Sequence, residues 1–176
     1  MPIQAGTHEL GPENGTLSVK TGRTGAAAKA GHDLVIDITA WHATLEVGED
    51  GAQSSLVLDA DATSLRVRSG TGGMQALGDD DKASIEQTID DDVLHRQGIT
   101  FRSTAVQADG NRLSVEGELT LVGTVRPIAF ELAVTDGRLS GSAVVKQSDW
   151  GITPYSTLFG ALKVADEVEV VVDAQL

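Results

Sequence analysis

The feature of this sequence that most restricts its fold is the alternation of apolar and polar residues along many short segments. In residues 34–47, Leu34, Ile36 and Ile38 fall on one face, and Asp37 and Thr39 fall on the other. Because successive side chains of a β-strand point to opposite faces of a sheet, this period of two predicts strands with one buried face. The chain is therefore predicted to be all-β.

Turn residues divide the alternating regions into short strands. The sequences Asp109-Gly110-Asn111 and Asp136-Gly137 lie between alternating segments and indicate hairpins. Residues 48–51 are expected to form another hairpin turn, and residues 70–78 a glycine-rich loop. The predicted strands are 16–21, 34–47, 55–60, 65–68, 99–106, 112–122, 126–135, 138–146 and 164–174. About eight strands at this spacing predict a closed antiparallel meander barrel, a fold that removes exposed sheet edges.

One segment, residues 80–94, departs from the period of two. Ile85, Ile89 and Val93 recur every four residues, and residues 79–81 are all Asp, which supplies an N-cap and negative charge in the first turn. The segment is predicted to be an amphipathic helix that packs these three apolar residues against the barrel and covers one of its mouths.

The far end of this helix carries three further acids, Asp90 to Asp92. Negative charge is unfavourable beside the C-terminal end of a helix dipole. The helix is therefore expected either to fray there or to be compensated by His95 and Arg96.

Length and composition favour one globular domain. The 176 residues are 40% hydrophobic and 22% charged, so a single domain over residues 1–176 is expected, with residues 1–14 as a flexible arm. Aromatic residues make up 3% of the chain and its formal charge is −13. Few stacking side chains and a repulsive net charge argue against nucleic acid as a partner.

Several chemistries and locations are disfavoured by what the sequence lacks. It contains no cysteine, which rules out disulfides and thiolate ligands or nucleophiles. No run of about 18 apolar residues is present, so no transmembrane span is expected. Residues 1–19 do not show the basic start and apolar stretch of an export signal, and a cytoplasmic location is expected.

The residue types that usually carry metals or catalysis form no compact pattern. His8, His32, His42 and His95 match no metal-binding spacing, and no nucleophile-elbow, dinucleotide or P-loop motif occurs. We therefore expect no metal, no cofactor and no catalytic residue. The pair His32 and Asp33 stays open: it stabilises a turn or, in an enzyme, serves as acid and base.

Several segments of the chain carry recognisable motifs. Residues 99–103 are I-T-F-R-S, residues 115–127 are V-E-G-E-L-T-L-V-G-T-V-R-P, residues 148–152 are S-D-W-G-I and residues 165–168 are A-D-E-V. In this order they resemble the YceI-like family of polyisoprenoid-binding proteins, with its patterns I-T-F-x-S, G-x-L-T-L-x-G-x-T-[RK]-P, S-D-F-G-I and G-D-E-V. Residues 31–34 and the predicted helix also have counterparts there. The sequence departs from the family in having Trp150 where Phe is usual.

The resemblance implies a lipocalin-like barrel around an apolar tunnel that holds an isoprenoid or similar amphiphile. Alternation places apolar residues two apart on the interior face of such a barrel. Phe101 and Trp150 come from the family motifs, and for Trp150 packing on the barrel wall is an equal alternative. The predicted lining is Ile36, Ile38, Phe101, Leu119, Leu121, Ile128, Phe130, Leu132 and Trp150.

Three functions are carried forward. The first is binding, sequestration or transfer of a polyisoprenoid or isoprenoid quinone. The second is a stress-linked structural or interaction protein with a packed barrel, and the third is a small-molecule enzyme that uses His32 and Asp33. A homodimer is compatible with each of them.

Overall fold

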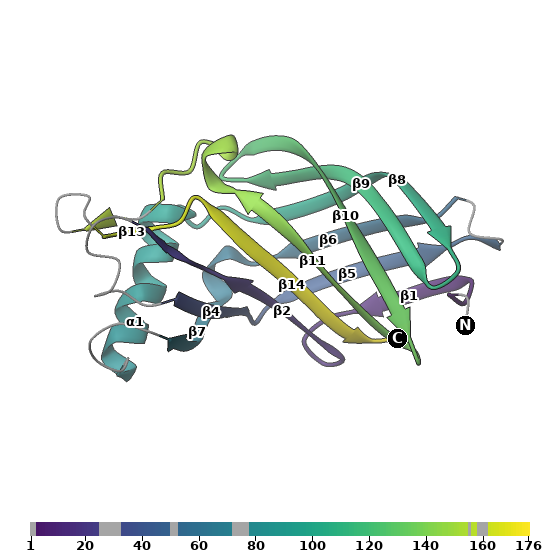
Figure 1. Cartoon of the computed structure of the whole chain (residues 1–176), viewed down its shortest axis with the longest axis horizontal. Helices are drawn as coiled ribbons and strands as arrows, with labels where there is room; N and C mark the ends of the chain where they lie inside the picture. Colours follow the sequence, from purple (N-terminus) through teal and green to yellow (C-terminus); the bar gives the residue numbers. More distant parts are fainter. Residues whose placement is uncertain (1–2, 25–32, 50–52, 72–77, 155, 158–161) are drawn as a thin grey trace.

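The computed structural model describes residues 3–24, 33–49, 53–71, 78–154, 156–157 and 162–176. Long antiparallel strands curl around a common interior, and one helix lies across the end opposite the two chain termini (Figure 1). The strands are β1 (Gly6–Leu10), β2 (Gly15–Lys20), β3 (Arg23–Thr24), β4 (Asp33–Ile38), β5 (Trp41–Val47), β6 (Ser55–Ala60), β7 (Leu65–Thr71), β8 (Ile99–Asp109), β9 (Arg112–Leu121), β10 (Thr124–Thr135), β11 (Arg138–Lys146), β12 (Ser156–Thr157), β13 (Leu162–Val164) and β14 (Glu167–Gln175). The helical segments are η3 (Ala62–Ser64), α1 (Asp79–Thr88), the π-helical turn η4 (Ile89–Val93) and η5 (Gln147–Trp150).

The main sheet has 11 strands in the order β1-β5-β6-β8-β9-β10-β11-β14-β2-β4-β7, and every pairing in it is antiparallel. The all-β class and the lipocalin-like fold are confirmed, whereas the count of about eight strands is wrong. The prediction of a closed barrel is also wrong, because β1 and β7 are the two ends of this hydrogen-bonded order. The sheet forms a curled half-barrel. A separate small sheet joins β12, β13 and β3.

Residues 34–47 are two strands instead of the one predicted. The chain bends at Thr39 and Ala40, so that β4 pairs with β2 and β7 while β5 pairs with β1 and β6. The bend is held by Thr39 N donating to Ser64 O (3.0 Å) and Asp61 N donating to Ala40 O (2.9 Å). These bonds tie the two ends of the sheet together where β4 leads into β5 and β6 leads through η3 into β7.

Residues 6–10 also differ from the prediction. They form β1, which pairs with β5 along its full length, whereas a flexible arm was predicted for residues 1–14. The strand ends with Leu10, which is only 2% exposed and belongs to the core. Asn14 fastens the following turn, since its Nδ2 donates to Gln175 O at 3.0 Å.

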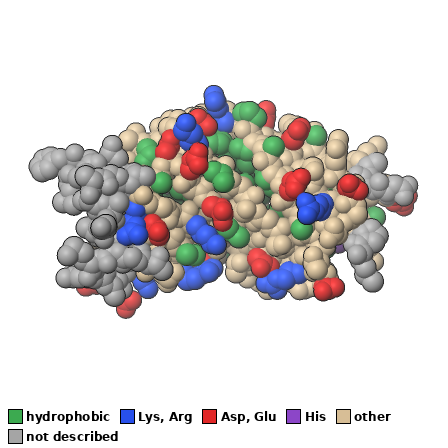
Figure 2. All heavy atoms as spheres, viewed as in Figure 1, with side chains coloured by type: hydrophobic (Ala, Val, Ile, Leu, Met, Phe, Trp, Pro, Cys, Tyr) green, Lys and Arg blue, Asp and Glu red, His purple; other side chains and the backbone are tan. Residues whose placement is uncertain are grey.

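The hairpins follow the turn chemistry of the sequence. Asp136 and Gly137 both have positive φ, 52° and 76°, as the two-residue turn between antiparallel strands requires. On the face of the molecule seen in Figure 2, acidic and basic side chains are interspersed, with small apolar areas between them. Most apolar side chains of the strands face inward, as the period of two predicts, although Val125 and Val144 are exposed.

The helix is confirmed, and it runs through the π-helical turn to Val93. Its N-cap is Gly78 rather than an aspartate, and Gly78 N donates to the Asp81 carboxylate at 3.1 Å. At the other end Arg96 pairs with Asp90 (3.2 Å) and Asp91 (2.9 Å), which supplies the compensation that the three acids require. None of the helices in the described residues is long and apolar enough to cross a membrane.

The helix docks on the sheet through both its apolar and its polar side chains. Ile85, Ile89 and Val93 are half-buried and pack against the core. Glu86 accepts a hydrogen bond from Val67 N at 3.1 Å, which occupies a backbone donor of the end strand β7.

Replacing Ile89 with Asp places an unpaired carboxylate in this contact. We expect the variant to lose about 2–3 kcal/mol of stability and to melt several degrees lower than the wild type, as measured by circular dichroism. Gln87→Asp serves as the control, because Gln87 is exposed on a different face of the same helix. Equal melting temperatures for Ile89→Asp and the wild type would show that the helix does not depend on this packing.

Candidate functional site

The interior of the curled sheet contains a cavity of about 430 Å³. It is lined by inward-facing side chains of the strands and by the inner face of α1 and η4. A volume of this size falls within the roughly 300–1,000 Å³ of pockets that enclose a small ligand. The barrel is therefore not completely filled by its own side chains.

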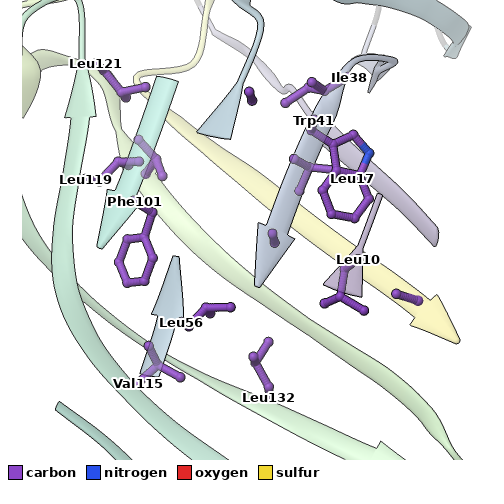
Figure 3. Close-up of a cluster of buried hydrophobic side chains, with 14 of the residues drawn as sticks. Leu10, Leu17, Ile38, Trp41, Leu56, Phe101, Val115, Leu119, Leu121 and Leu132 are labelled. Carbon is purple, nitrogen blue, oxygen red and sulfur yellow. The ribbon is translucent and has the colours of Figure 1, made fainter. Parts of the chain in front are cut away.

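The predicted lining residues come together on the wall of this cavity, with one exception. Figure 3 shows side chains from several strands, among them Leu17, Phe101 and Leu119, turned toward the same interior. The predicted residues that line the cavity are Ile36, Ile38, Phe101, Leu119, Leu121, Ile128, Phe130 and Leu132. The face assigned to the interior from alternation is thus the face that borders the cavity.

Trp150 is the exception, because it is not among the lining residues. Its side chain is 3% exposed, and its indole N–H donates to Leu119 O at 2.8 Å. A buried indole N–H requires an acceptor. The carbonyl of Leu119 in β9 provides one, and Trp150 is part of the buried core without bordering the cavity.

Two aromatic rings shape one side of the cavity. The Phe101 and Phe130 ring centroids are 5.3 Å apart, with the rings inclined at 57°. Phe101 lies over Gly117 of β9, where a Cβ atom would come within 2.5 Å of the ring carbon Cζ. The absence of a side chain at Gly117 lets this ring approach the β9 backbone closely.

Several groups of lining residues were not predicted from the sequence, including inward-facing residues of β2, β5, β6 and β11. Val168, Val170 and Val172 of β14 also border the cavity, and their spacing of two residues was a usable signal. Ile85 and Ile89 of the helix were expected to pack on the barrel, but they also form part of the cavity wall. Where a helix closes over a hollow depends on tertiary structure, and no local pattern in the sequence reports it.

The two ends of the barrel differ in chemistry. At the end away from the helix, Leu45, Leu113 and Val115 are at most 1% exposed and do not border the cavity, so side chains fill this end. At the helix end the lining includes the polar residues Thr21, Ser84, Thr88 and Gln147. In the part of the chain that the structure describes, no Asp, Glu, Lys or Arg lines the cavity.

A hydrogen-bonded corner holds the backbone next to Gln147. Gln147 N donates to Asp166 O (2.8 Å), and Ser148 donates to the Asp166 carboxylate through its backbone N (2.8 Å) and its hydroxyl (2.5 Å). The hydrogen bond from the Ser148 hydroxyl is the main reason that the pKa of Asp166 is lowered from its ordinary value. The corner joins the end of β11 to the start of β14.

The described histidines, His8, His42 and His95, do not form a metal-binding cluster together. His42 lies 2.6 Å from the Glu9 carboxylate, and the Nε2 atom of His8 lies 2.9 Å from Gln4 O. His95 is exposed, and His32 lies outside the described residues. Among the described residues no cluster of three or more potential metal ligands occurs.

Asp33 belongs to the outer surface rather than to the cavity. Its carboxylate pairs with Arg23 at 3.0 Å, and it is not among the lining residues. Asp33 therefore does not point into the cavity as an acid or base of an enzyme site would.

Comparison with known proteins gives one family and several solved structures. The family model described as YceI-like domain matches residues 17–176. The fold is similar to that of Burkholderia cenocepacia BcnA, with a TM-score of 0.65 and 20% identity over 90% of this chain and 94% of that one. It is also similar to the Campylobacter jejuni YCEI protein, with a TM-score of 0.58 and 15% identity over 80% of this chain and 82% of that one. No curated protein matches the sequence.

Gly117→Ala tests the packing of the Phe101 ring. The added methyl group overlaps the ring and the adjacent β8 backbone, so we expect a loss of about 1–3 kcal/mol in the free energy of unfolding. Urea denaturation measures it. Gly98→Ala is the control, because a Cβ atom at Gly98 meets nothing within 4 Å. Equal stability of the two variants would contradict the packing described.

Ser148→Ala tests the corner. Without the hydroxyl donor, the pKa of Asp166 should rise toward its ordinary value, as followed by an NMR titration of the carboxylate. Because the folded-state pKa is the lower one, the stabilisation is present above the unfolded-state pKa and is lost as the pH falls through the folded-state value. Ser140→Ala, at an exposed position of β11, should leave the Asp166 titration unchanged. An unaltered titration in Ser148→Ala would rule out this hydrogen bond as the cause.

Proposed function

The chain belongs to the YceI-like family, and from this premise we propose that its cavity holds the apolar tail of an amphiphile, a polyisoprenoid or an isoprenoid quinone. In this proposal the protein binds, sequesters or transfers the ligand without transforming it. The residues that contact the tail are the eight predicted residues on the cavity wall, Ile36, Ile38, Phe101, Leu119, Leu121, Ile128, Phe130 and Leu132.

The observation that carries the proposal is the cavity itself, which is large, apolar and free of charged lining residues in the described chain. Each buried methylene contributes about 0.8 kcal/mol, so one isoprene unit contributes roughly 3–4 kcal/mol. A few buried units offset the ~4–15 kcal/mol lost on association. An apolar tail alone therefore provides enough free energy for binding.

The two alternative functions receive less support. A structural protein with a packed barrel does not account for a hollow of about 430 Å³. An enzyme built on His32 and Asp33 is disfavoured because Asp33 pairs with Arg23 and does not line the cavity. The homodimer and the cytoplasmic location stay predictions from the sequence.

Native mass spectrometry and solvent extraction of freshly purified protein test the proposal. We expect the wild type to carry a bound amphiphile and Leu121→Glu, which places a carboxylate on the cavity wall, to lose it. Thr120→Glu is the matched control, because Thr120 lies next along β9 with its side chain on the opposite face.

Circular dichroism must accompany these measurements to show that each variant folds. Ligand retained by a folded Leu121→Glu protein would place the binding site elsewhere. A wild-type protein that purifies without ligand and binds no added prenol would contradict the proposed function.

A further inference from the structure

Gln147 is an unusual member of the cavity wall. It directly follows β11, whose inward side chains Ala143 and Val145 precede it at intervals of two residues. The residue is 8% exposed and lines the cavity, so a carboxamide continues a row of apolar side chains. A buried amide costs free energy unless its polar atoms have hydrogen-bond partners.

Only half of this carboxamide is used by the protein. Its Nε2 donates to Ala165 O at 3.1 Å. No hydrogen bond from the described residues reaches Oε1. Oε1 is not among the fully enclosed side-chain oxygens that lack a hydrogen-bond partner, so part of its surface is accessible. Oε1 is therefore available to a group inside the cavity.

The side chain is held in place before any ligand arrives. Its amide nitrogen is fixed to Ala165 O, and its backbone N is fixed to Asp166 O at 2.8 Å. Ser148, the next residue, donates two hydrogen bonds to the Asp166 carboxylate. An acceptor that is already ordered loses little conformational entropy when it binds a donor.

The charges around the cavity limit what that donor can be. No Lys or Arg of the described chain lines the wall, so none of the described lining side chains compensates the charge of a phosphate or a carboxylate. Moving an unpaired anion into an apolar cavity is strongly unfavourable. A neutral hydroxyl donates to Oε1 without this cost.

We propose that Gln147 is the polar anchor of the cavity and accepts a hydrogen bond from the hydroxyl group of a neutral amphiphile, such as a prenyl alcohol or a hydroquinone. This inference rests on the proposed function and narrows its ligand class. The head lies at the helix end beside Gln147, and the tail runs toward the end closed by Leu45, Leu113 and Val115.

The test compares two probes that differ in one donor. Farnesol and farnesyl methyl ether are titrated into the full chain, and binding is followed by tryptophan fluorescence, since Trp41 lines the cavity. The ether accepts but cannot donate a hydrogen bond. One neutral hydrogen bond corresponds to about a three- to tenfold preference of the wild type for the alcohol.

Gln147→Met removes the acceptor and keeps the length of the side chain. The preference for the alcohol should then fall to about one, while the ether still binds. The ratio of the two affinities within one variant is not altered by a general loss of packing at the Ala165 contact. Lys146→Met, the same replacement at the exposed preceding residue, should keep the wild-type preference.

The outcomes separate this inference from the function on which it rests. Equal affinities for alcohol and ether in the wild type, or a preference that survives in Gln147→Met, would overturn the role of Gln147 and leave the cavity as a binding site. Farnesyl phosphate bound as tightly as farnesol would overturn the neutral head group. If no probe binds the wild type, the proposed function itself fails.

Discussion

The register of the antiparallel ladder is the constraint on which the rest of this structure depends. A shift of one residue in any strand would turn its apolar set outward and its polar set into the cavity. The register is fixed by short hairpins such as that at Asp136 and Gly137, and by the hydrogen bonds of Thr39, Ala40, Asp61 and Ser64 that join the two ends of the sheet. The cavity wall is apolar because this register places one face of every long strand inside.

Alternation predicted which face of the strands borders the cavity, because burial of one sheet face is a local property of each strand, but only eight of the residues on the wall were named in advance. Alternation does not report where the ladder is irregular. In β8 the register shifts between Ser103 and Ala105, and the buried positions change from Phe101 before the shift to Val106 after it. An inserted residue of this kind exchanges the buried and exposed positions along the strand, and no residue type in the segment indicates where it occurs.

The division of residues 34–47 and the docking of residues 6–10 have a similar origin. Thr39 and Ala40 are not turn-forming residues, and their bend is stabilised by Ser64 from another part of the chain. β1 is short and has Thr7 and Glu9 exposed, so its own sequence pattern is a weak signal. Its strand conformation depends mainly on the pairing with β5. Trp150 could not be placed because its position depends on the carbonyl of Leu119, which is distant in the sequence.

The ends of the strands explain why the cavity has a polar side. Within a ladder each inward position belongs to the apolar row, and its backbone groups are paired with neighbouring strands. Beyond the last hydrogen bond between two strands the backbone turns away. Polar side chains there form hydrogen bonds with backbone groups that no longer have a partner in a neighbouring strand. Thr21, just after β2, accepts from Leu34 N at 3.1 Å, and Gln147, just after β11, donates to Ala165 O. Apart from Ser142 of β11, the polar residues of the wall therefore lie on the helix or where the strands end near it, and the opposite end stays a filled apolar core.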